Sequence, residues 1–388
     1  MSVTAPRGFV AAGIACGIKP SGDPDLALVA TDDGRPATAA AVFTSNGAAA
    51  APVIVSRRHL GASGGSAAAV VLNSGNANAA TGEAGVAHST RTCELVAKEI
   101  GCEAAHVLVC STGLIGIPLP FAPIESGVAR LVAERADGEG GARAARAIMT
   151  TDTRPKETVQ HAGAVTIGGM AKGAAMLAPN MATMLAVLTT DAAVSPAALR
   201  AHLEAGVRDS FNTLSVDGCT STNDTVIVLA NGRAGEPDAA EFGAALAAAC
   251  LDLATQMAGD AEGATKVVRV RVTGAADDVD AARAARKVAE SQLVKCSFYG
   301  EDPYWGRIVS ELGSSGAAFD LDRVSVAYGG VVVARGGVAC AHDEAAVRAH
   351  LAGREIAVHA DLGLGSGAGA VLTNDLTHGY IDENMRTS

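Results

Sequence analysis

Aromatic side chains are scarce in this chain of 388 residues, where Phe, Trp and Tyr together make up only 3%. Hydrophobic residues nevertheless account for 49% of the sequence. The core must therefore be built from closely packed Ala, Val, Leu and Ile. This amount of apolar sequence is enough for two domains or for one large one.

An excess of basic residues is also lacking, because 41 Asp and Glu outnumber 30 Lys and Arg and give a net charge of −11. Nucleic acid and anionic membranes select basic surfaces, so this acidic chain is a poor candidate for either partner. Small-molecule substrates, bound through local positive groups, are favoured instead.

Long apolar runs and metal motifs are missing as well. No segment of about 18 apolar residues could span a membrane, and residues 1–19 lack the unbroken apolar stretch of a secretory signal. The eight cysteines form no C-x-x-C pair, and the nine histidines form no H-E-x-x-H motif. We therefore expect a cytoplasmic protein with reduced, buried thiols and no metal site.

Hydrophobic patterns predict strands and helices that alternate irregularly. The glycine-rich residues 363–369 do not fit a nucleotide-binding loop, because the lysine and the following helix of such a loop are missing. They are expected to form a strand against which other backbone segments pack closely. Strands are expected at 68–72, 106–110, 184–190, 225–230, 266–272, 324–328, 331–334 and 355–360, and helices at 83–100 and 197–208.

This irregular mixture favours an α+β fold of layered sheets and helices over a barrel or a doubly wound parallel sheet. The run Thr-Gly-Ala-Ala-Asp-Asp at 273–278 interrupts the pattern. We therefore expect a larger domain at 1–272 and a smaller C-terminal domain at 273–388.

The most informative stretch runs from Gly168 to Leu185 and contains Lys172 in a glycine-rich segment, a proline turn and then Thr183. By itself, Thr183 is typical of a residue that enters a strand.

The letters G-x-S-x-G at 61–65 precede a strand instead of following one, which indicates a loop and not a nucleophile elbow. A serine–histidine triad stays open, because its members need not be close in sequence.

Residues 168–185 resemble the self-cleavage signature of the bifunctional glutamate N-acetyltransferase and ornithine acetyltransferase family of arginine biosynthesis. Other segments also look like motifs of this family and follow one another in the family order. They are residues 44–46, 73–78, 111–116, 150–153, 217–225, 260–266 and 300–307. One such match could arise by chance, whereas the ordered set is specific.

The resemblance implies that the chain cuts itself between Ala182 and Thr183, which gives chains 1–182 and 183–388. Thr183 then becomes an N-terminal nucleophile whose own α-amino group, with a pKa of about 7.7–8.0, acts as the base. The oxyanion hole of the family maps onto Thr112 and Gly113.

Substrate contacts implied by the resemblance include Lys172, which suits a carboxylate, and Glu262, which suits a free amino group. The full set maps onto Thr150, Lys172, Thr183, Glu262, Asn384 and, at the C-terminus, Ser388 or Thr387. Two departures bear on substrate preference: the C-terminus after Asn384 is shorter than expected, and Tyr304 stands where asparagine is expected.

The implied reaction moves acetyl from N2-acetyl-L-ornithine to L-glutamate through an acetyl-threonine, without a cofactor and with acetyl-CoA open as a co-substrate. The implied fold is an α/β/β/α-like sandwich with a second, smaller α/β domain, and the cleaved chains are expected to form an α2β2 heterotetramer. Rival interpretations are a self-processing aminopeptidase or amidase of similar fold, and a paralogue that acts on another acyl-amino acid.

Overall fold

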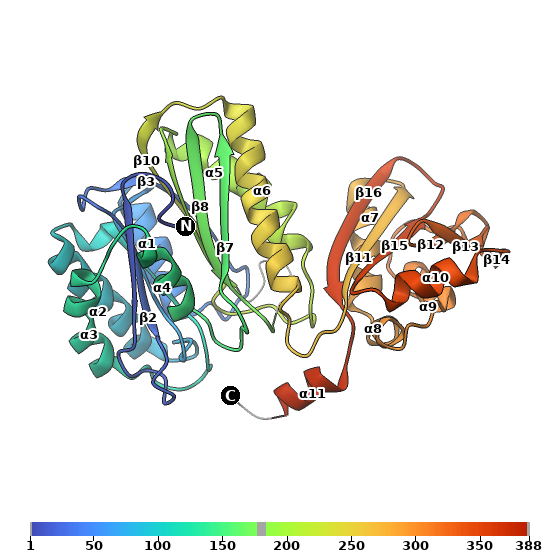
Figure 1. The fold of residues 1–388 in the computed structure, drawn as a ribbon, viewed down its shortest axis with the longest axis horizontal. Helices are drawn as coiled ribbons and strands as arrows, with labels where there is room; N and C mark the ends of the chain where they lie inside the picture. Colours follow the sequence, from blue (N-terminus) through green and yellow to red (C-terminus); the bar gives the residue numbers. More distant parts are fainter. Residues whose placement is uncertain (1, 177–183, 386–388) are drawn as a thin grey trace. The chain divides into compact units, whose positions relative to one another are not determined.

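The computed structural model describes residues 2–176 and 184–385, which form two compact units (Figure 1). Of these residues, the first unit contains 2–176, 184–212 and 219–257, and the second contains 213–218 and 258–385. The expected domain boundary at 272/273 falls inside a strand of the second unit, β11 (Val267–Ala275).

Two sheets form the centre of the first unit. The first sheet has the order β1-β2-β5-β6, and the second sheet has the order β4-β3-β10-β9-β8-β7. The strands of the first sheet are β1 (Phe9–Ile14), β2 (Leu26–Thr31), β5 (Ala69–Asn73) and β6 (Val107–Ser111). Those of the second sheet are β3 (Ala37–Phe43), β4 (Ser66–Ala67), β7 (Lys156–Ala162), β8 (Val165–Lys172), β9 (Leu185–Ala192) and β10 (Thr225–Gly235).

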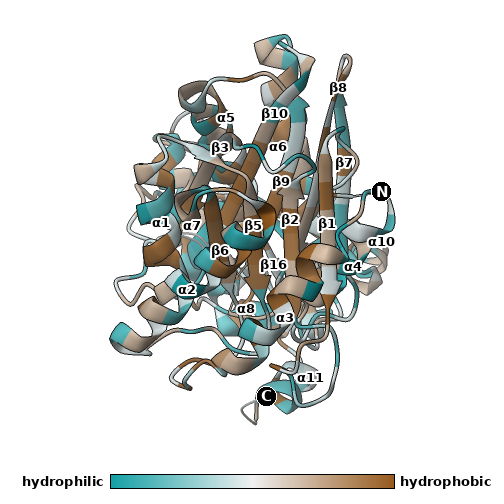
Figure 2. Cartoon of the chain, turned by 90° about the vertical axis from the view of Figure 1, so that its left-hand side faces the viewer, coloured by the Kyte–Doolittle hydropathy of each residue, from teal (hydrophilic) through white to brown (hydrophobic). Residues whose placement is uncertain are grey.

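Strand β2 explains why the sheets stack, because it is buried on both faces. Ala27 and Val29 belong to a core shared with Val187 and Ile227 of the second sheet. Leu28 and its alternating neighbours instead pack in a core with residues of three helices, α1 (Ala51–Ala62), α2 (Gly82–Ile100) and α3 (Phe121–Ala133). The hydropathy colouring shows these inner strands as the brown centre of the unit (Figure 2).

Helices α5 (Pro196–Arg208) and α6 (Ala239–Ala258) complete the sandwich beside the second sheet (Figure 1). A Cβ on Gly169 of β8 would lie 3.3 Å from Leu253 of α6. A Cβ on Gly206 of α5 would lie 3.3 Å from the Cα of Ala247, so the two helices also pack closely against each other. The order of layers is helix, sheet, sheet, helix, which confirms the expected α+β sandwich. A short helix, α4 (Glu139–Ala147), packs against β1.

The second unit is built on one six-stranded sheet with the order β14-β13-β12-β15-β11-β16. Its apolar core joins Val268 and Val270 of β11 to Ala284 and Val288 of helix α7 (Asp278–Glu290). The other strands are β12 (Ser325–Tyr328), β13 (Val331–Arg335), β14 (Val338–Ala339), β15 (Glu355–Asp361) and β16 (Gly367–Asn374). The helices are α7 (Asp278–Glu290), α8 (Gln292–Tyr299), α9 (Trp305–Gly313), α10 (Glu344–Ala352) and α11 (His378–Asn384).

Two local expectations from the sequence were wrong. The glycine-rich strand expected at 363–369 starts only at Gly367, because Gly363 has a φ of +65° and the N–H groups of Leu364 and Gly365 both donate to Gly274 O. The chain therefore turns before it enters β16. The cysteines are free thiols, but Cys219 and Cys296 are exposed instead of buried.

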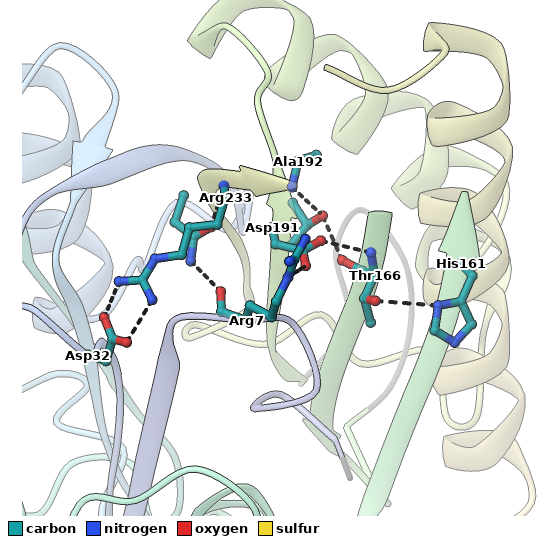
Figure 3. Close-up of polar contacts among 9 residues, drawn as sticks. Arg7, Asp32, His161, Thr166, Asp191, Ala192 and Arg233 are labelled. Carbon is teal, nitrogen blue, oxygen red and sulfur yellow. Dashed lines mark hydrogen bonds and ion pairs between the residues drawn. The ribbon is translucent and has the colours of Figure 1, made fainter. Parts of the chain in front are cut away.

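Polar contacts tie the N-terminal segment to one end of the sandwich (Figure 3). Asp191, in β9, accepts a hydrogen bond from Thr166 N at 2.8 Å and faces Arg7 Nε at 3.4 Å. Arg233, in β10, pairs with Asp32 after β2. These contacts join both sheets, although exposed ion pairs such as Arg233–Asp32 contribute little to stability.

Residues 2–176 and 184–385 lack two kinds of structural feature. None of the described helices is both long and apolar enough to cross a membrane. Within the same part of the chain, no group of three or more His, Cys, Asp or Glu side chains is arranged to hold a metal ion.

Candidate active site

The turn after β6 has a backbone that only glycine fits. Gly113 has a φ of +133°, and a Cβ there would lie 2.3 Å from the carbonyl carbon of Gly75. Both the dihedral angle and the contact exclude a side chain. The close approach of the 73–76 loop therefore determines where the Gly113 peptide lies.

Thr112 and Gly113 present two hydrogen-bond donors at this turn. Within the part of the chain that the structure describes, Gly113 N–H has no acceptor, and the residue is exposed. Thr112 Oγ1 accepts a hydrogen bond from Lys172 Nζ at 3.0 Å. Because an ammonium group can only donate, the threonine oxygen is the acceptor and its own hydrogen is left to donate elsewhere.

Asparagine side chains hold the turn in place. Asn223 Nδ2 donates to the carbonyl oxygens of Ser111 and Ala77, at 2.9 and 2.6 Å. Asn73 Oδ1 accepts from Ser111 Oγ at 2.6 Å, and Asn73 O accepts from Thr112 N at 2.9 Å. Every one of these groups is buried, so the two donors are preorganised as catalysis of acyl transfer requires.

Lys172 reaches the turn from the last position of β8. Its side chain is 3% exposed. β8 pairs with β7 in register, with Ala171 opposite Lys156. Two lysines on adjacent strands thus lie near the same end of the second sheet.

Asp152 lies between these lysines and the backbone. Its carboxylate forms a fully buried ion pair with Lys156 Nζ and accepts hydrogen bonds from Thr150 N at 3.0 Å and Gly173 N at 2.8 Å. Burial alone would raise the pKa of Asp152, but the opposing charges of Lys172 and Lys156 and the hydrogen bonds lower it to about 2. Asp152 is therefore a permanent anion near neutral pH.

Asp224 anchors the residue that follows Thr183 in the sequence. Its Oδ1 accepts a hydrogen bond from Met184 N at 2.9 Å, and Thr225 N donates to Met184 O at 3.1 Å. Asp224 Oδ2 is buried and has no hydrogen-bond partner among the described residues. Burial raises the pKa of Asp224 well above its ordinary value, which favours the neutral form of this carboxyl.

The second unit contains another polar cluster around Glu262. Asn384, at the end of α11, donates from Nδ2 to Glu262 Oε2 at 2.8 Å. A cavity of about 130 Å³ is lined in part by Glu262, Asp217 and Lys295. Lys295 donates to Val216 O at 2.7 Å, and burial lowers its pKa to about 8. The carboxylates make this cavity suited to an amino group.

The expected site residues fall into three sets. The structure brings Thr112, Gly113, Lys172 and Thr150 together in the first unit, where one network of contacts joins them. Glu262 and Asn384 contact each other in the second unit. Ala182, Thr183, Thr387 and Ser388 lie outside the described residues.

Several residues of the site were missed by reasoning from the sequence: Asp152, Lys156, Asn223, Asp224 and Lys295. Asp152, Asn223 and Asp224 do occur inside the segments that resemble family motifs, and this was the available signal. Tyr304 precedes α9 in the second unit and is 56% exposed. Ser63 donates its hydroxyl to Ser66 O at 2.6 Å in the turn between α1 and β4, as a loop residue does.

The α+β sandwich presents an N–H group and a hydroxyl directly after β6, with the buried cation of Lys172 reaching them from the end of β8. Donors held in this way suit an enzyme that transfers acyl groups. Comparison with known proteins gives the particular family. The model of the ArgJ family matches residues 10–387. The chain belongs to the ArgJ family.

Curated relatives match along all or nearly all of their length. The chain is 49% identical over 389 residues to the arginine biosynthesis bifunctional protein ArgJ of Thermobifida fusca, with 100% of both chains covered. It is 49% identical over 394 residues to the protein of that name from Mycolicibacterium paratuberculosis, covering 100% of this chain and 96% of the relative. A solved structure of ornithine acetyltransferase complexed with ornithine, from Mycobacterium tuberculosis, is 50% identical over 46% of this chain and 94% of that chain, with a TM-score of 0.44.

Proposed function

We propose that this enzyme transfers acetyl from N2-acetyl-L-ornithine to L-glutamate through an acetyl ester on Thr183, after it has cut its own chain between Ala182 and Thr183. Membership of the ArgJ family supports the reaction class. The observation that carries the proposal is the turn at Thr112 and Gly113, whose two donors are fixed in place next to Lys172.

Self-cleavage would prepare the nucleophile. The Thr183 hydroxyl attacks the carbonyl carbon of Ala182, the peptide C–N bond breaks, and water hydrolyses the resulting ester. The new α-amino group of Thr183 then serves as the base, because a pKa of about 7.7–8.0 leaves part of it neutral near pH 7. Asp224 supports this step by holding the amide nitrogen of Met184, which is bonded directly to the carbonyl carbon of Thr183.

Acetyl transfer follows in two halves. Thr183 Oγ attacks the acetyl carbonyl carbon, its proton passes through the α-amino group to the leaving nitrogen, and ornithine departs. The amino nitrogen of glutamate then attacks the ester, and Thr183 Oγ recovers a proton as the C–O bond breaks. In both halves, Gly113 N–H and the Thr112 hydroxyl donate to the negative oxygen of the tetrahedral intermediate.

Charge assigns roles to the remaining residues. Lys172 would hold the carboxylate of the N-acetyl amino acid, with Thr150 beside it. Glu262 and Asn384 would contact the free amino group, and Ser388 or Thr387 would complete the site. We further propose a cytoplasmic α2β2 heterotetramer that needs no cofactor. Incubation with glutamate and acetyl-CoA, without acetyl-ornithine, decides whether acetyl-CoA is a second donor.

The decisive experiment compares intact masses of the wild-type protein and the Thr183→Ala variant. We expect two wild-type fragments that meet at Ala182/Thr183, of 182 and 206 residues (388 − 182), and one uncut chain in the variant. Acetyl-ornithine should then leave an acetyl group on the Thr183 peptide. A wild-type chain that stays uncut and unacetylated would refute the proposal.

The acceptor distinguishes this reaction from hydrolysis. Release of ornithine that depends on glutamate supports a transferase. Release at the same rate with water alone would identify an amidase or aminopeptidase, and efficient transfer from a different acyl-amino acid would identify a specialised paralogue.

A further inference from the structure

Lys295, in α8, is a buried lysine to which the proposed reaction assigns no role. It is 5% exposed and lines the cavity of about 130 Å³ that Glu262 also lines. Lysines are rarely buried unless a carboxylate pairs with them. Within the described part of the chain, however, the ammonium group of Lys295 donates only to Val216 O at 2.7 Å and to Thr373 Oγ1 at 3.1 Å. No direct ion pair therefore accounts for its burial.

The two hydrogen bonds leave one hydrogen of the Lys295 ammonium group without an acceptor. An ammonium group has three N–H donors and no acceptor. Thr373 accepts from it, because the hydroxyl of Thr373 donates its own hydrogen to Ala289 O at 3.1 Å. Burial lowers the pKa of Lys295 to about 8, so the protonated form still predominates near pH 7. The third hydrogen is thus available to an anion.

Two carboxylates near Lys295 are engaged by other donors. Asp375 Oδ1 accepts from two backbone N–H groups, at 3.0 and 2.9 Å. Glu290 Oε1 accepts from Ser215 Oγ at 3.0 Å and from Arg286 at 3.3 Å. The charges of both acids oppose the fall in the pKa of Lys295, and neither acid is hydrogen-bonded to it. They support its positive charge without using its third hydrogen.

The same cavity also offers acceptors to a cation. Asn374 lines the cavity and donates from Nδ2 to Ala258 O at 2.8 Å and to Lys266 O at 2.9 Å, which fixes the orientation of its amide. Its Oδ1 is buried and has no hydrogen-bond partner in residues 2–176 and 184–385. Together with the carboxylate of Glu262, this oxygen suits an ammonium group. One cavity in the second unit therefore carries groups for side chains of either charge.

The proposed reaction requires such a cavity. Acetyl-ornithine has a side-chain ammonium group, whereas glutamate has a side-chain carboxylate, and a two-step exchange takes them in turn at one site. Glu262 attracts the first and repels the second. A cation close to Glu262 on the wall of the cavity would allow the second substrate to bind where the first has left.

We propose that Lys295 determines the specificity for the acceptor: its free N–H binds the side-chain carboxylate of glutamate, in the cavity where Glu262 binds the side-chain ammonium group of acetyl-ornithine. This inference rests on the proposed function, which assigns Glu262 to the amino group but leaves the side chain of glutamate without a partner.

The test measures kcat/KM separately for the two substrates, because in a two-step exchange each value reports only the half-reaction of that substrate. Lys295→Met keeps most of the side-chain volume and removes the charge. We expect kcat/KM for glutamate to fall about tenfold or more, as for loss of a charged contact. The value for acetyl-ornithine should stay the same or rise, because a positive charge near its ammonium group is gone. A residue with only a structural role would lower both values.

Glutamine, which has a neutral amide in place of the side-chain carboxylate, completes the comparison. The wild type should prefer glutamate to glutamine as the acceptor by about tenfold or more, and Lys295→Met should lose this preference. Lys266→Met is the matched control. Lys266 is buried in the same unit and donates to Leu351 O and Gly353 O, but it does not line the cavity. Its preference for glutamate should match that of the wild type.

The outcomes separate the inference from the proposed function. Lys295→Gln, which keeps an N–H group for Val216 O, takes the place of Lys295→Met if the latter does not fold. A folded variant that keeps the wild-type preference for glutamate would overturn the inference. Equal kcat/KM values for glutamate and glutamine in the wild type, which need no variant, would also overturn it. A wild-type enzyme that releases no ornithine from acetyl-ornithine would instead overturn the proposed function.

Discussion

Replacing Thr112 by valine should abolish most of the acetyl transfer while preserving the shape of the side chain. The hydroxyl accepts a hydrogen bond from Lys172 Nζ at 3.0 Å. Because an ammonium group can only donate, the hydrogen of the hydroxyl is left to donate to the oxyanion in the proposed reaction. Loss of one oxyanion donor lowers kcat by about 10²–10³-fold, or about 2.7–4 kcal/mol.

The same substitution removes one acceptor of the buried Lys172 ammonium group. Hydrogen bonds to charged groups contribute about 1.5–3 kcal/mol, so the free energy of unfolding should also fall by an amount in this range. Thr112→Ser keeps the oxygen and loses only a methyl group, so it serves as the matched control. Its kcat should stay within about tenfold of the wild type, because the freer serine rotamer weakens the geometry without removing the donor.

The assay is steady-state ornithine release from acetyl-ornithine in the presence of glutamate, on protein whose self-cleavage has been measured by intact mass. Normalising kcat to the cut fraction separates catalysis from maturation. A fully cut Thr112→Val enzyme with kcat within a few-fold of the wild type would show that the hydroxyl does not stabilise the transition state, and the assignment of the Thr112–Gly113 turn would fail.

Further predictions concern glycine and the two buried aspartates. Gly113→Ala should lose activity and about 1–3 kcal/mol of stability, since φ is +133° and the new Cβ would meet Gly75; unchanged chemical denaturation would contradict this. Because the pKa of Asp152 is lowered to about 2, its stabilisation of about 2 kcal/mol is present above pH 4 and is lost as the pH falls toward 2. Asp152→Asn should flatten that decline in a urea series measured at different pH values. Because the pKa of Asp224 is raised, its effect on the stability of the folded protein has the opposite pH dependence. The stabilisation is present below about pH 4 and is lost as the pH rises above that value. Asp224→Asn, which keeps an acceptor for Met184 N, should remove this loss, and an identical pH slope in variant and wild type would count against a neutral Asp224.

Most of the elements expected from local pattern lie within a few residues of their places in the structure, although that set left out others such as β1, β2 and β8. The helix expected at 83–100 is α2 (Gly82–Ile100), and the strands expected at 324–328 and 331–334 form the antiparallel pair β12 and β13. These segments carry their own periodicity and turn residues, so nothing distant is needed to define them. The layer order was available only through the resemblance, because composition alone indicated no more than the α+β class.

The contacts within the site could not be predicted from the sequence. Lys172 and Thr112 are 60 residues apart, and Asn223 holds Ser111 across 112 residues. Such pairs depend on the register between strands, which the packing of both faces determines. Asp152 and Lys156 are only four residues apart, yet nothing in the sequence shows that both are buried, since charged residues at this spacing are usually solvated.

The antiparallel ladder of β8 and β9 has a consequence for how the protein is made. Six residue pairs, from Ile167↔Thr190 to Lys172↔Leu185, join the two strands, and the bond between Ala182 and Thr183 lies in the segment that connects them. A chain cut at this bond would consist of two polypeptides that interleave within one sheet, because β3, β7 and β8 precede the cut and β9 and β10 follow it. Neither polypeptide would contain the whole of this second sheet, so maturation would have to follow folding. The refolding of a denatured, cut enzyme would become a second-order assembly, whose yield depends on concentration.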